Sequence, residues 1–235
     1  MIGVILAAGD GTRLAKSTGQ NICKPLRKIN NKHLLEYSLD NLIELGATKA
    51  YVVIGKQGDS IKDAFGDEYK ELKLQYVCQK EQKGLMNAFV EALNVMDCDD
   101  TVILQLSDEI FLDLKTEEIK KALQKDFDFY CGITFEDDAE KIKNNFSVEA
   151  DNESRLIKCI EKPQVVTNNI KGTGFTVFGS EMLEIIKAHP ELCDLCDSFN
   201  YLTANGYKGL ALHIAEREFN INTLDDLTEA EKCLK

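Results

Sequence analysis

The feature that most constrains this chain is an apolar run that breaks into a glycine-rich, basic turn. Residues 1–8 are almost wholly apolar, and Gly9, Gly11 and Arg13 follow them. A short apolar run of this kind predicts a buried strand, and the glycines allow positive φ and a close approach of backbone N–H groups to an anion. Arg13 adds a fixed charge and a planar set of donors. The sequence therefore predicts a strand leading into a phosphate-binding loop, to which Lys24 can return a second cation.

The composition predicts one domain over residues 1–235. The chain has 235 residues, of which 44% are hydrophobic, enough to bury one substantial core. No apolar run approaches the roughly 20 residues of a membrane-spanning helix, and the N-terminal run lacks the basic segment and cleavage site of a secretory signal. We therefore expect a soluble, cytoplasmic protein that does not enter a membrane.

Charge and cysteine content narrow the choice of partners. The chain carries 28 Lys and Arg against 40 Asp and Glu, a formal net charge of −12. This balance argues against a nucleic-acid or anionic membrane surface, so any phosphate site must be local. The eight cysteines are expected to be reduced thiols. The CxxC pair, Cys193 and Cys196, is interpreted as part of a helix or turn, because no second pair or histidine cluster accompanies it.

Hydrophobic periodicity predicts helices and strands that alternate along the first half of the chain. The first of these helices is expected to stop at Gly46. The alternation favours a parallel sheet with helical crossovers. The expected elements are helices at about 35–43, 59–65 and 88–96 and strands at about 51–55, 74–77 and 101–109.

The second half of the chain departs from this alternation. A hairpin-like pair of strands around a turn at 151–154 predicts that the sheet is mixed. Ser180 is interpreted as the cap of a helix that ends near Pro190, and Thr223, with Asp226 three residues on, as the cap of the last helix. The strands expected here are at about 129–134, 144–149, 155–163 and 169–178.

Residues 6–14, LAAGDGTRL, together with Lys24-Pro25 resemble the signature of the sugar-1-phosphate nucleotidyltransferases, which make NDP-sugars and related activated compounds. Taken alone such a turn is common, and its spacing is neither GxGxxG nor GxxxxGK[ST]. The resemblance implies an α/β fold of the Rossmann-like, three-layer α/β/α type, with a mostly parallel mixed central sheet. Further segments resemble motifs of this family in the family's order, at residues 79–85, 101–109, 144–149, 161–163, 169–178 and 211–227.

The resemblance implies that a nucleoside triphosphate and a sugar 1-phosphate give an NDP-sugar and pyrophosphate. It assigns the nucleotide phosphates to Arg13, the α-phosphate region to Lys24 and the sugar phosphate to Lys162. It assigns Mg²⁺ to Asp108 and Asn220, whose oxygens are ligands that a hard cation accepts. The other implied substrate-binding residues are Leu6, Ala8, Gly9, Gly11 and Thr12 around the triphosphate, Gln79 and Gly84 around the base, and Glu161 and Gly174 around the acceptor.

Several positions depart from the family's pattern and leave the substrates open. Ser107 and Glu109 stand where the family usually has glycine and a neutral residue, and Phe146 and Ser147 replace tyrosine and glycine. Thymidylyl- and uridylyl-transferring glucose-1-phosphate enzymes are the nearest resemblance. The alternatives are a cytidylyltransferase acting on a polyol, choline or phosphonate compound, or an inactive nucleotide- or sugar-binding regulatory subunit. The acceptor-binding part is expected at about 129–180, and a homo-oligomer is compatible with the sequence.

Overall fold

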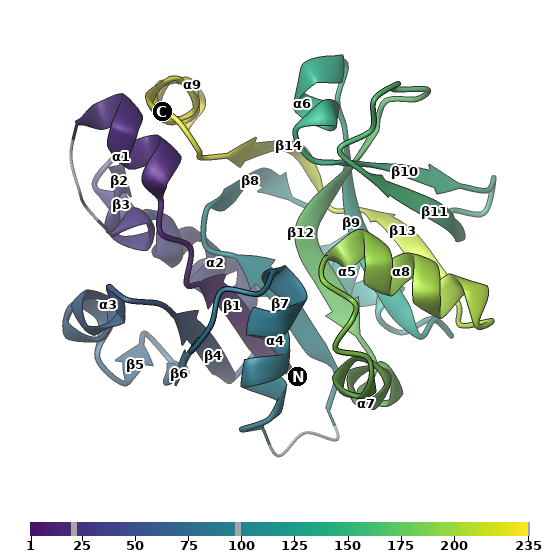
Figure 1. Cartoon of the computed structure of the whole chain (residues 1–235), viewed down its shortest axis with the longest axis horizontal. Helices are drawn as coiled ribbons and strands as arrows, with labels where there is room; N and C mark the ends of the chain where they lie inside the picture. The colour runs from purple at the N-terminus through teal and green to yellow at the C-terminus, as the bar shows by residue number, and fades with distance from the viewer. Residues whose placement is uncertain (20–22, 97–99, 235) are drawn as a thin grey trace.

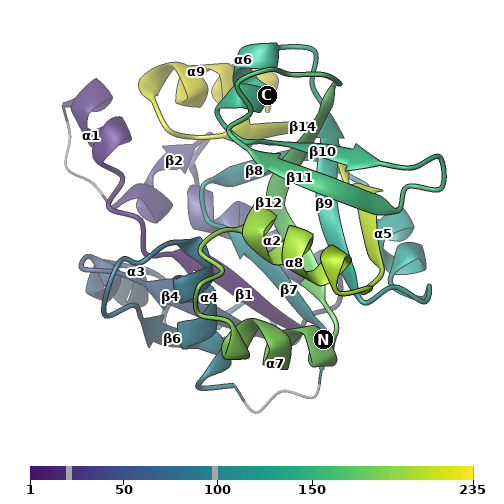
Figure 2. The same cartoon turned by 45° about the vertical axis from the view of Figure 1, so that its right-hand side comes forward.

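The computed structural model describes residues 1–19, 23–96 and 100–234, and it has a central sheet with helices on both faces (Figures 1 and 2). β1 (Ile2–Ala7) lies between β4 (Lys49–Ile54) and β7 (Val102–Leu106) and is parallel to both. β6 (Leu72–Cys78) continues the sheet beyond β4, again in parallel. The predicted parallel part of the sheet is therefore confirmed, and β1 is at its centre.

The other half of the sheet is mostly antiparallel. β12 (Ile170–Phe178) pairs antiparallel with β7, with β9 (Phe129–Phe135) and with β10 (Phe146–Ala150). β11 (Leu156–Glu161) forms an antiparallel pair with β10, and β13 (Gly209–His213) lies parallel to β9. The sheet is thus mixed, as the hairpin-like segment predicts.

Side chains alternate along β1 and supply a core on each face of the sheet. Val4 and Leu6 belong to one cluster, and Ile5 and Ala7 belong to the other, with all four at most 9% exposed. Because period-2 alternation sends successive side chains to opposite faces, one strand anchors both helical layers. The helices are α4 (Leu85–Leu93), α7 (Ser180–Ala188) and α8 (Leu195–Ala204) on the first face, and α2 (Leu34–Glu44) and α5 (Thr116–Ala122) on the second.

A small second sheet carries the C-terminal segment towards the first loop. β8 (Glu109–Leu114) pairs antiparallel with β14 (Ala215–Asn220). A third cluster of buried residues includes Leu14 from the segment after the first loop and Phe219 from β14, so the two regions pack together. The remaining elements are α1 (Thr12–Thr18), a 3₁₀ turn (Lys24–Leu26), β2 (Lys28–Ile29), β3 (Lys32–His33), α3 (Gly58–Phe65), β5 (Glu68–Tyr69), α6 (Ala139–Lys143) and α9 (Leu224–Cys233).

The two predicted helix caps have different outcomes. Thr223 caps α9, since its side chain accepts from the Asp226 N–H while the Asp226 side chain accepts from the Thr223 N–H. Ser180 is instead the first residue of α7, whose N-cap is Gly179 with no side-chain cap. The prediction for Ser180 is therefore wrong, because the backbone enters this helix one residue earlier.

Two segments differ from the periodicity-based expectation. Residues 101–109 are not one strand: β7 ends at Leu106, Ser107 and Asp108 form a turn, and β8 begins at Glu109. α1 occupies a segment where no helix was expected, because Leu14 is its one buried residue and a single apolar contact leaves no periodic pattern.

No helix within the described ranges is long and apolar enough to cross a membrane. The described cysteines are free, and Cys98 lies outside the described residues. Cys193 is exposed just before α8, and Cys196 is buried within that helix. The interpretation of the CxxC pair as part of a helix or turn therefore holds for Cys196, whereas Cys193 lies in neither.

Candidate functional site

The first loop joins β1 to α1 and forms one wall of a cavity. Gly11 has a φ of 59°, and a Cβ atom added to it would lie 2.9 Å from the Cβ of Lys24. Glycine is therefore required there both for the backbone conformation and for the approach of Lys24. Gly9 does not have a positive φ, and nothing lies within 4 Å of the place of its Cβ. The loop therefore makes its left-handed turn at Gly11 and does not use at Gly9 the positive φ that a glycine allows.

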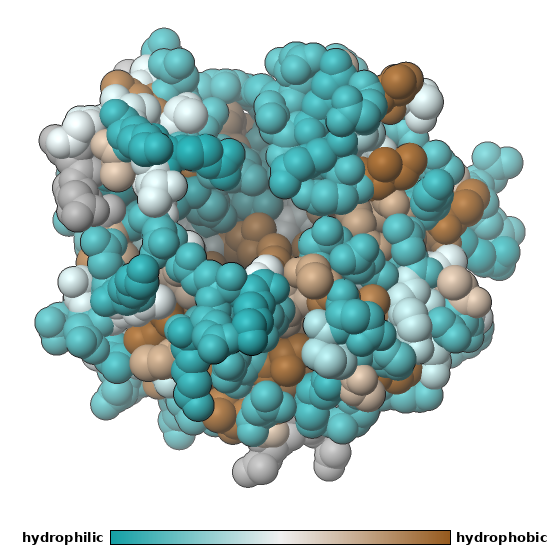
Figure 3. Space-filling model, viewed as in Figure 1, coloured by the Kyte–Doolittle hydropathy of each residue, from teal (hydrophilic) through white to brown (hydrophobic). Residues whose placement is uncertain are grey.

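The cavity has a volume of about 470 Å³. Figure 3 shows a hollow near the middle of this face, with hydrophobic residues at its floor and hydrophilic residues around it. Gln82, Ser107 and Asn222 also line the cavity, and we had not predicted them from the sequence. The predicted residues that line it are Leu6, Ala8, Gly9, Gly11, Thr12, Arg13, Lys24, Gln79, Gly84 and Asp108.

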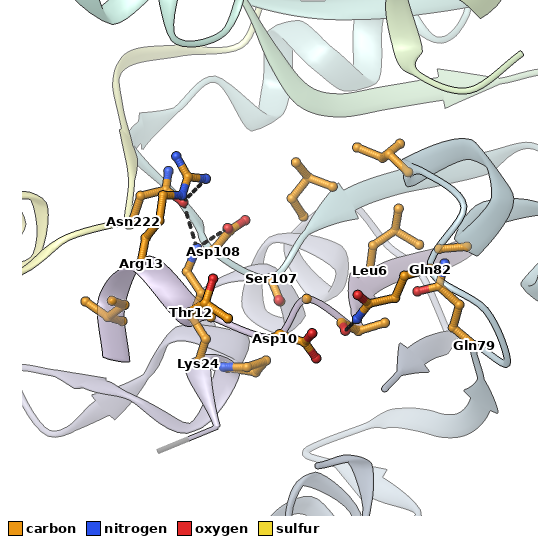
Figure 4. Close-up of a pocket in the computed structure, with 18 of the residues that line it drawn as sticks. Leu6, Asp10, Thr12, Arg13, Lys24, Gln79, Gln82, Ser107, Asp108 and Asn222 are labelled. Carbon is orange, nitrogen blue, oxygen red and sulfur yellow. Dashed lines mark hydrogen bonds and ion pairs between the residues drawn. The ribbon is translucent and has the colours of Figure 1, made fainter. Parts of the chain in front are cut away.

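Two cations and a carboxylate meet at one end of the cavity (Figure 4). Lys24 forms an ion pair with Asp108, and its Nζ also donates to Oδ1 of Asn222 at 3.1 Å. An Nη of Arg13 donates to the same Asn222 oxygen at 2.8 Å. The side chains of Lys24 and Asp108 are 10% and 24% exposed. The pair is therefore partly shielded from water, which strengthens its electrostatic interaction.

Backbone hydrogen bonds between distant segments hold this end together. The Ser107 N–H donates to the carbonyl of Leu6 at 3.1 Å, which fixes the turn after β7 against β1. The Ile221 N–H donates to the carbonyl of Asp108 at 2.9 Å, which fixes the segment after β14 against the same turn. Asp108 therefore lies beyond the carboxyl end of a parallel strand, where open α/β sheets bind their ligands.

Asn220 and Asn222 play different parts in this arrangement. Nδ2 of Asn222 donates to Oδ1 of Asn220 at 2.5 Å, and Nδ2 of Asn220 is 3.3 Å from Oδ1 of Asn145. The side-chain Oδ1 of Asn222 therefore faces Lys24 and Arg13, whereas Oδ1 of Asn220 accepts the hydrogen bond from Asn222. Asn220 lines a second cavity of about 290 Å³, which shares Arg13 and Asn222 with the first. The resemblance had offered a signal for Asn222, because the family motif allows asparagine at that position too.

The other end of the cavity carries two glutamine side chains (Figure 4). Nε2 of Gln79 is 3.5 Å from Oδ1 of Asn87, and Nε2 of Gln82 donates to the carbonyl of Ala8 at 3.3 Å. Gly84 has a φ of 107°, and a Cβ there would lie 2.7 Å from the carbonyl oxygen of Cys193. Gly84 is therefore required by the protein's own backbone, independently of any ligand.

Glu161 and Lys162 lie outside the lining of this cavity. Their side chains contact each other, with Nζ of Lys162 3.2 Å from Oε1 of Glu161. Lys162 has a φ of 43°, and this left-handed turn departs from the extended path on which neighbouring side chains would point to opposite sides. The side chain of Lys162 is 69% exposed and that of Glu161 is 37% exposed, so both are accessible to a ligand.

Gly174 lies on β12 behind Leu106, which lines the cavity. A Cβ at Gly174 would lie 2.3 Å from Cγ of Leu106, and the Gly174 N–H donates to Oε2 of Glu109 at 2.7 Å. The glycine therefore lets β12 pack closely against the end of β7. Gly174 does not line the first cavity itself, so a role for it in acceptor binding stays a prediction.

A group of buried ionisable residues lies behind the site, and we had not predicted it. Lys171 forms an ion pair with Glu218, and their side chains are 3% and 1% exposed. Burial raises the pKa of Glu109 well above its usual value, and the nearby carboxylates of Glu218 and Asp108 raise it further. Burial also raises the pKa of Glu218. Burial lowers the pKa of Lys171, but the ion pair and hydrogen bond with Glu218, together with the charges of Glu109 and Glu136, raise it by more.

Known proteins share both the sequence pattern and the fold. A family profile described as nucleotidyl transferase matches residues 2–231. The whole chain is 28% identical to UTP–glucose-1-phosphate uridylyltransferase AglF of Haloferax volcanii and covers 97% of that protein.

Solved structures with the same fold include two that differ in substrate. A UDP-glucose pyrophosphorylase from Acinetobacter baumanii has a TM-score of 0.84 and 17% identity, covering 98% of this chain and 92% of that one. The inositol-1-phosphate CTP transferase from T. maritima has a TM-score of 0.80 and 17% identity, covering 98% of this chain and 93% of that one. The expected three-layer fold with a mixed central sheet is therefore confirmed.

Proposed function

Because this chain belongs to the nucleotidyl transferase family, we propose that it joins the nucleotidyl group of a nucleoside triphosphate to a sugar 1-phosphate and releases pyrophosphate. The observation that carries the proposal is the meeting of Arg13, Lys24 and Asp108 at one end of the first cavity, with Gln79 and Gln82 at the other. Arginine and lysine suit phosphates, and side-chain amides suit the edge of a base. Because the similar protein AglF of Haloferax volcanii is a UTP–glucose-1-phosphate uridylyltransferase, UTP and glucose 1-phosphate are the first substrates to try.

The proposed reaction suits a site whose functional groups are mainly charges. The phosphate oxygen of the acceptor is already an anionic nucleophile, so no serine, cysteine or histidine has to be activated. The barrier arises from bringing polyanions together and from charge on the departing pyrophosphate, so positioning and electrostatics carry the catalysis. Two unit charges about 4 Å apart interact by about 1 kcal/mol in water and about 4 kcal/mol at an effective dielectric near 20. Cations in a partly dehydrated cavity therefore control the rate.

Each charged residue has a proposed place along the substrates. Arg13 and Lys24 bind the phosphates of the nucleotide, and Lys162 binds the phosphate of the acceptor. Glu161 accepts hydrogen bonds from acceptor hydroxyls, near the β12 strand that contains Gly174. The Lys162–Glu161 contact is between exposed side chains, and such a pair contributes little, so a ligand can replace it.

The phosphate end also has the ligands that a magnesium ion prefers. The Lys24 ammonium lies beside Asp108 and Oδ1 of Asn222, so the space next to these oxygens already accommodates a positive charge. Mg²⁺ commonly uses one or two protein carboxylates and completes its shell with substrate phosphates and water. No cluster of three or more His, Cys, Asp or Glu side chains suited to a metal occurs in the described part of the chain. A bound Mg²⁺ would neutralise charge on the phosphates.

Two alanine variants distinguish the amide oxygens that can serve this site. Asn222→Ala removes the oxygen that faces Lys24 and Arg13, so we expect kcat/KM to fall by about 100-fold, the upper range for a residue that tunes a metal site. Asn220→Ala removes a partner of Asn222, and we expect a loss of about tenfold. Pyrophosphate release at several Mg²⁺ concentrations measures both. A larger loss in Asn220→Ala would restore Asn220 as the ligand, as the resemblance implies.

A pyrophosphate-release assay tests the proposed function. CTP, UTP, dTTP, ATP and GTP are each combined with sugar 1-phosphates and with phosphorylated polyols, choline and phosphonates, in the presence of Mg²⁺. Release that requires both one nucleotide and one sugar 1-phosphate confirms the proposal and identifies both substrates. Release with CTP and a non-sugar acceptor would favour a cytidylyltransferase instead. Nucleotide binding without release under any combination would favour a regulatory subunit.

A further inference from the structure

The phosphate end of the first cavity already holds a cation that belongs to the protein. Lys24 pairs with Asp108 and donates to Oδ1 of Asn222 at 3.1 Å. These are the two oxygens that the proposed metal would use. An ammonium and a divalent ion placed beside the same carboxylate and the same amide oxygen repel each other strongly, because both are positive and they would lie within a few ångströms of each other. In the nucleotide-free protein, Lys24 therefore competes directly with the metal.

The side-chain oxygen of Asn222 is not free to turn away from Lys24. Nδ2 of Asn222 donates to Asn220 at 2.5 Å, and the Asn222 N–H donates to Oδ2 of Asp226 at 2.8 Å. These contacts hold the Asn222 oxygen towards the cavity, where it accepts from Arg13 as well as from Lys24. A metal ion arriving alone would thus have to displace one cation and approach a second.

The Cβ atom of Lys24 is held in place, whereas its ammonium group can move to another position in the cavity. The Cβ of Lys24 packs so closely on Gly11 that a Cβ there would lie 2.9 Å away, and Pro25 follows in the 3₁₀ turn. Movement is therefore confined to the three flexible side-chain carbons beyond Cβ and the ammonium group that they carry. Gly9 and Thr12 line the same cavity, so phosphates bound at the first loop would lie near Lys24.

We propose that Lys24 occupies the metal position in the nucleotide-free protein and leaves Asp108 when nucleotide phosphates bind, so that a divalent cation binds together with the nucleotide. This inference rests on the proposed function, because it requires a phosphate-bearing ligand in the first cavity. It makes nucleotide and metal binding mutually supportive: the phosphates attract Lys24, and its departure exposes the carboxylate. Removing the lysine should therefore open the site to metal without any nucleotide.

Titration of the nucleotide-free protein with Mn²⁺, followed by electron paramagnetic resonance, tests the proposal directly. Mn²⁺ is a suitable probe because, like Mg²⁺, it prefers carboxylate and carbonyl oxygens. We expect the wild-type protein to bind weakly and Lys24→Met to bind about tenfold more tightly, a typical coupling between two ligands. The matched control is Lys16→Met, which removes an exposed lysine from α1 and should bind as the wild type does. The double variant Lys24→Met/Asp108→Ala should lose the gain, which would locate it at Asp108.

Equal Mn²⁺ affinity in the wild type and Lys24→Met would overturn the proposal, because Lys24 would then not compete with the metal. A gain that survives in the double variant would overturn it as well, since the site would lie elsewhere. Calorimetric titration of the wild type with UTP and the other four nucleotides in the presence of Mg²⁺ keeps the two hypotheses apart. Nucleotide binding with an unchanged Mn²⁺ affinity in Lys24→Met rejects only the proposed exchange, in which the metal replaces Lys24 beside Asp108. Failure to bind any of the five nucleotides rejects the proposed function, and the exchange with it.

Discussion

Replacing Asp108 with alanine is expected to lower kcat by about 10³-fold, near the upper end of what one preorganised electrostatic contact contributes to a transition state. The variant loses the carboxylate beside Lys24 and leaves one amide oxygen, that of Asn222, facing two cations. Pyrophosphate release at saturating substrate concentrations measures the effect. The fold should survive, because the backbone hydrogen bonds from Ser107 to Leu6 and from Ile221 to Asp108 do not use the Asp108 side chain.

A second substitution at the same position separates charge from shape. Asp108→Asn keeps the size of the side chain and removes its charge, so we expect nearly the same loss of kcat as in Asp108→Ala. Asp63→Ala removes an exposed aspartate from α3, away from the cavity, and should turn over as the wild type does. Wild-type turnover in Asp108→Asn would contradict the role given to the carboxylate.

Lys171→Met is expected to lower the free energy of unfolding by about 3–5 kcal/mol, because it leaves a buried carboxylate without its partner. The side chains of Lys171 and Glu218 are 3% and 1% exposed, so water cannot replace the lost contact. Oε1 of Glu218 already lacks a hydrogen-bond partner among the described residues. Urea unfolding followed by circular dichroism measures the difference.

A double variant tests whether the unpaired charge causes this loss. Lys171→Met/Glu218→Leu removes both charges and should recover most of the stability, because apolar pairs often replace buried ion pairs without loss. Lys187→Met breaks an ion pair with Glu184 on the surface of α7 and should change stability little. If the double variant were as unstable as Lys171→Met, packing and not charge would explain the effect.

The loss in Lys171→Met should also depend on pH. Burial raises the pKa of Glu218 above its usual value of 4.5, and Lys171 is the group that lowers it. A carboxyl group with a raised folded-state pKa stabilises the folded protein most below its unfolded pKa, and this stability is lost as pH rises through the folded pKa. The free energy of unfolding of Lys171→Met should therefore be closer to that of the wild type at about pH 5 than at about pH 8. A gap that is the same at both pH values would argue against titration of Glu218.

Local patterns were sufficient to locate the first strand and the loop that follows it. An apolar run followed by Gly9, Gly11 and Arg13 predicts a strand and its turn from residues that are neighbours in the chain. Asp108 was identified through the resemblance of residues 101–109 to a motif of the family. The structure brings Arg13 and Asp108 to one cavity, because their strands, β1 and β7, are parallel neighbours in the sheet.

Elements without a strong local pattern could not be predicted in this way. α1 buries Leu14 alone, so it shows no apolar stripe. β8 follows β7 after a two-residue turn, and the apolar residues of both strands read as one continuous run. The turn between them is made by hydrogen bonds from Ser107 to Leu6 and from Ile221 to Asp108, which join residues about a hundred positions apart.

The amino-acid sequence was therefore enough to identify the fold class, the first loop and most of the residues around the first cavity. The tertiary structure was needed to show that Asn222 rather than Asn220 faces Lys24, that Glu161 and Lys162 contact each other, and that Lys171 pairs with Glu218. The physical reason is the range of the interactions. Strands, turns and caps depend on neighbours along the chain, whereas the direction of a side chain and the partner of a buried charge depend on which distant segments pack together.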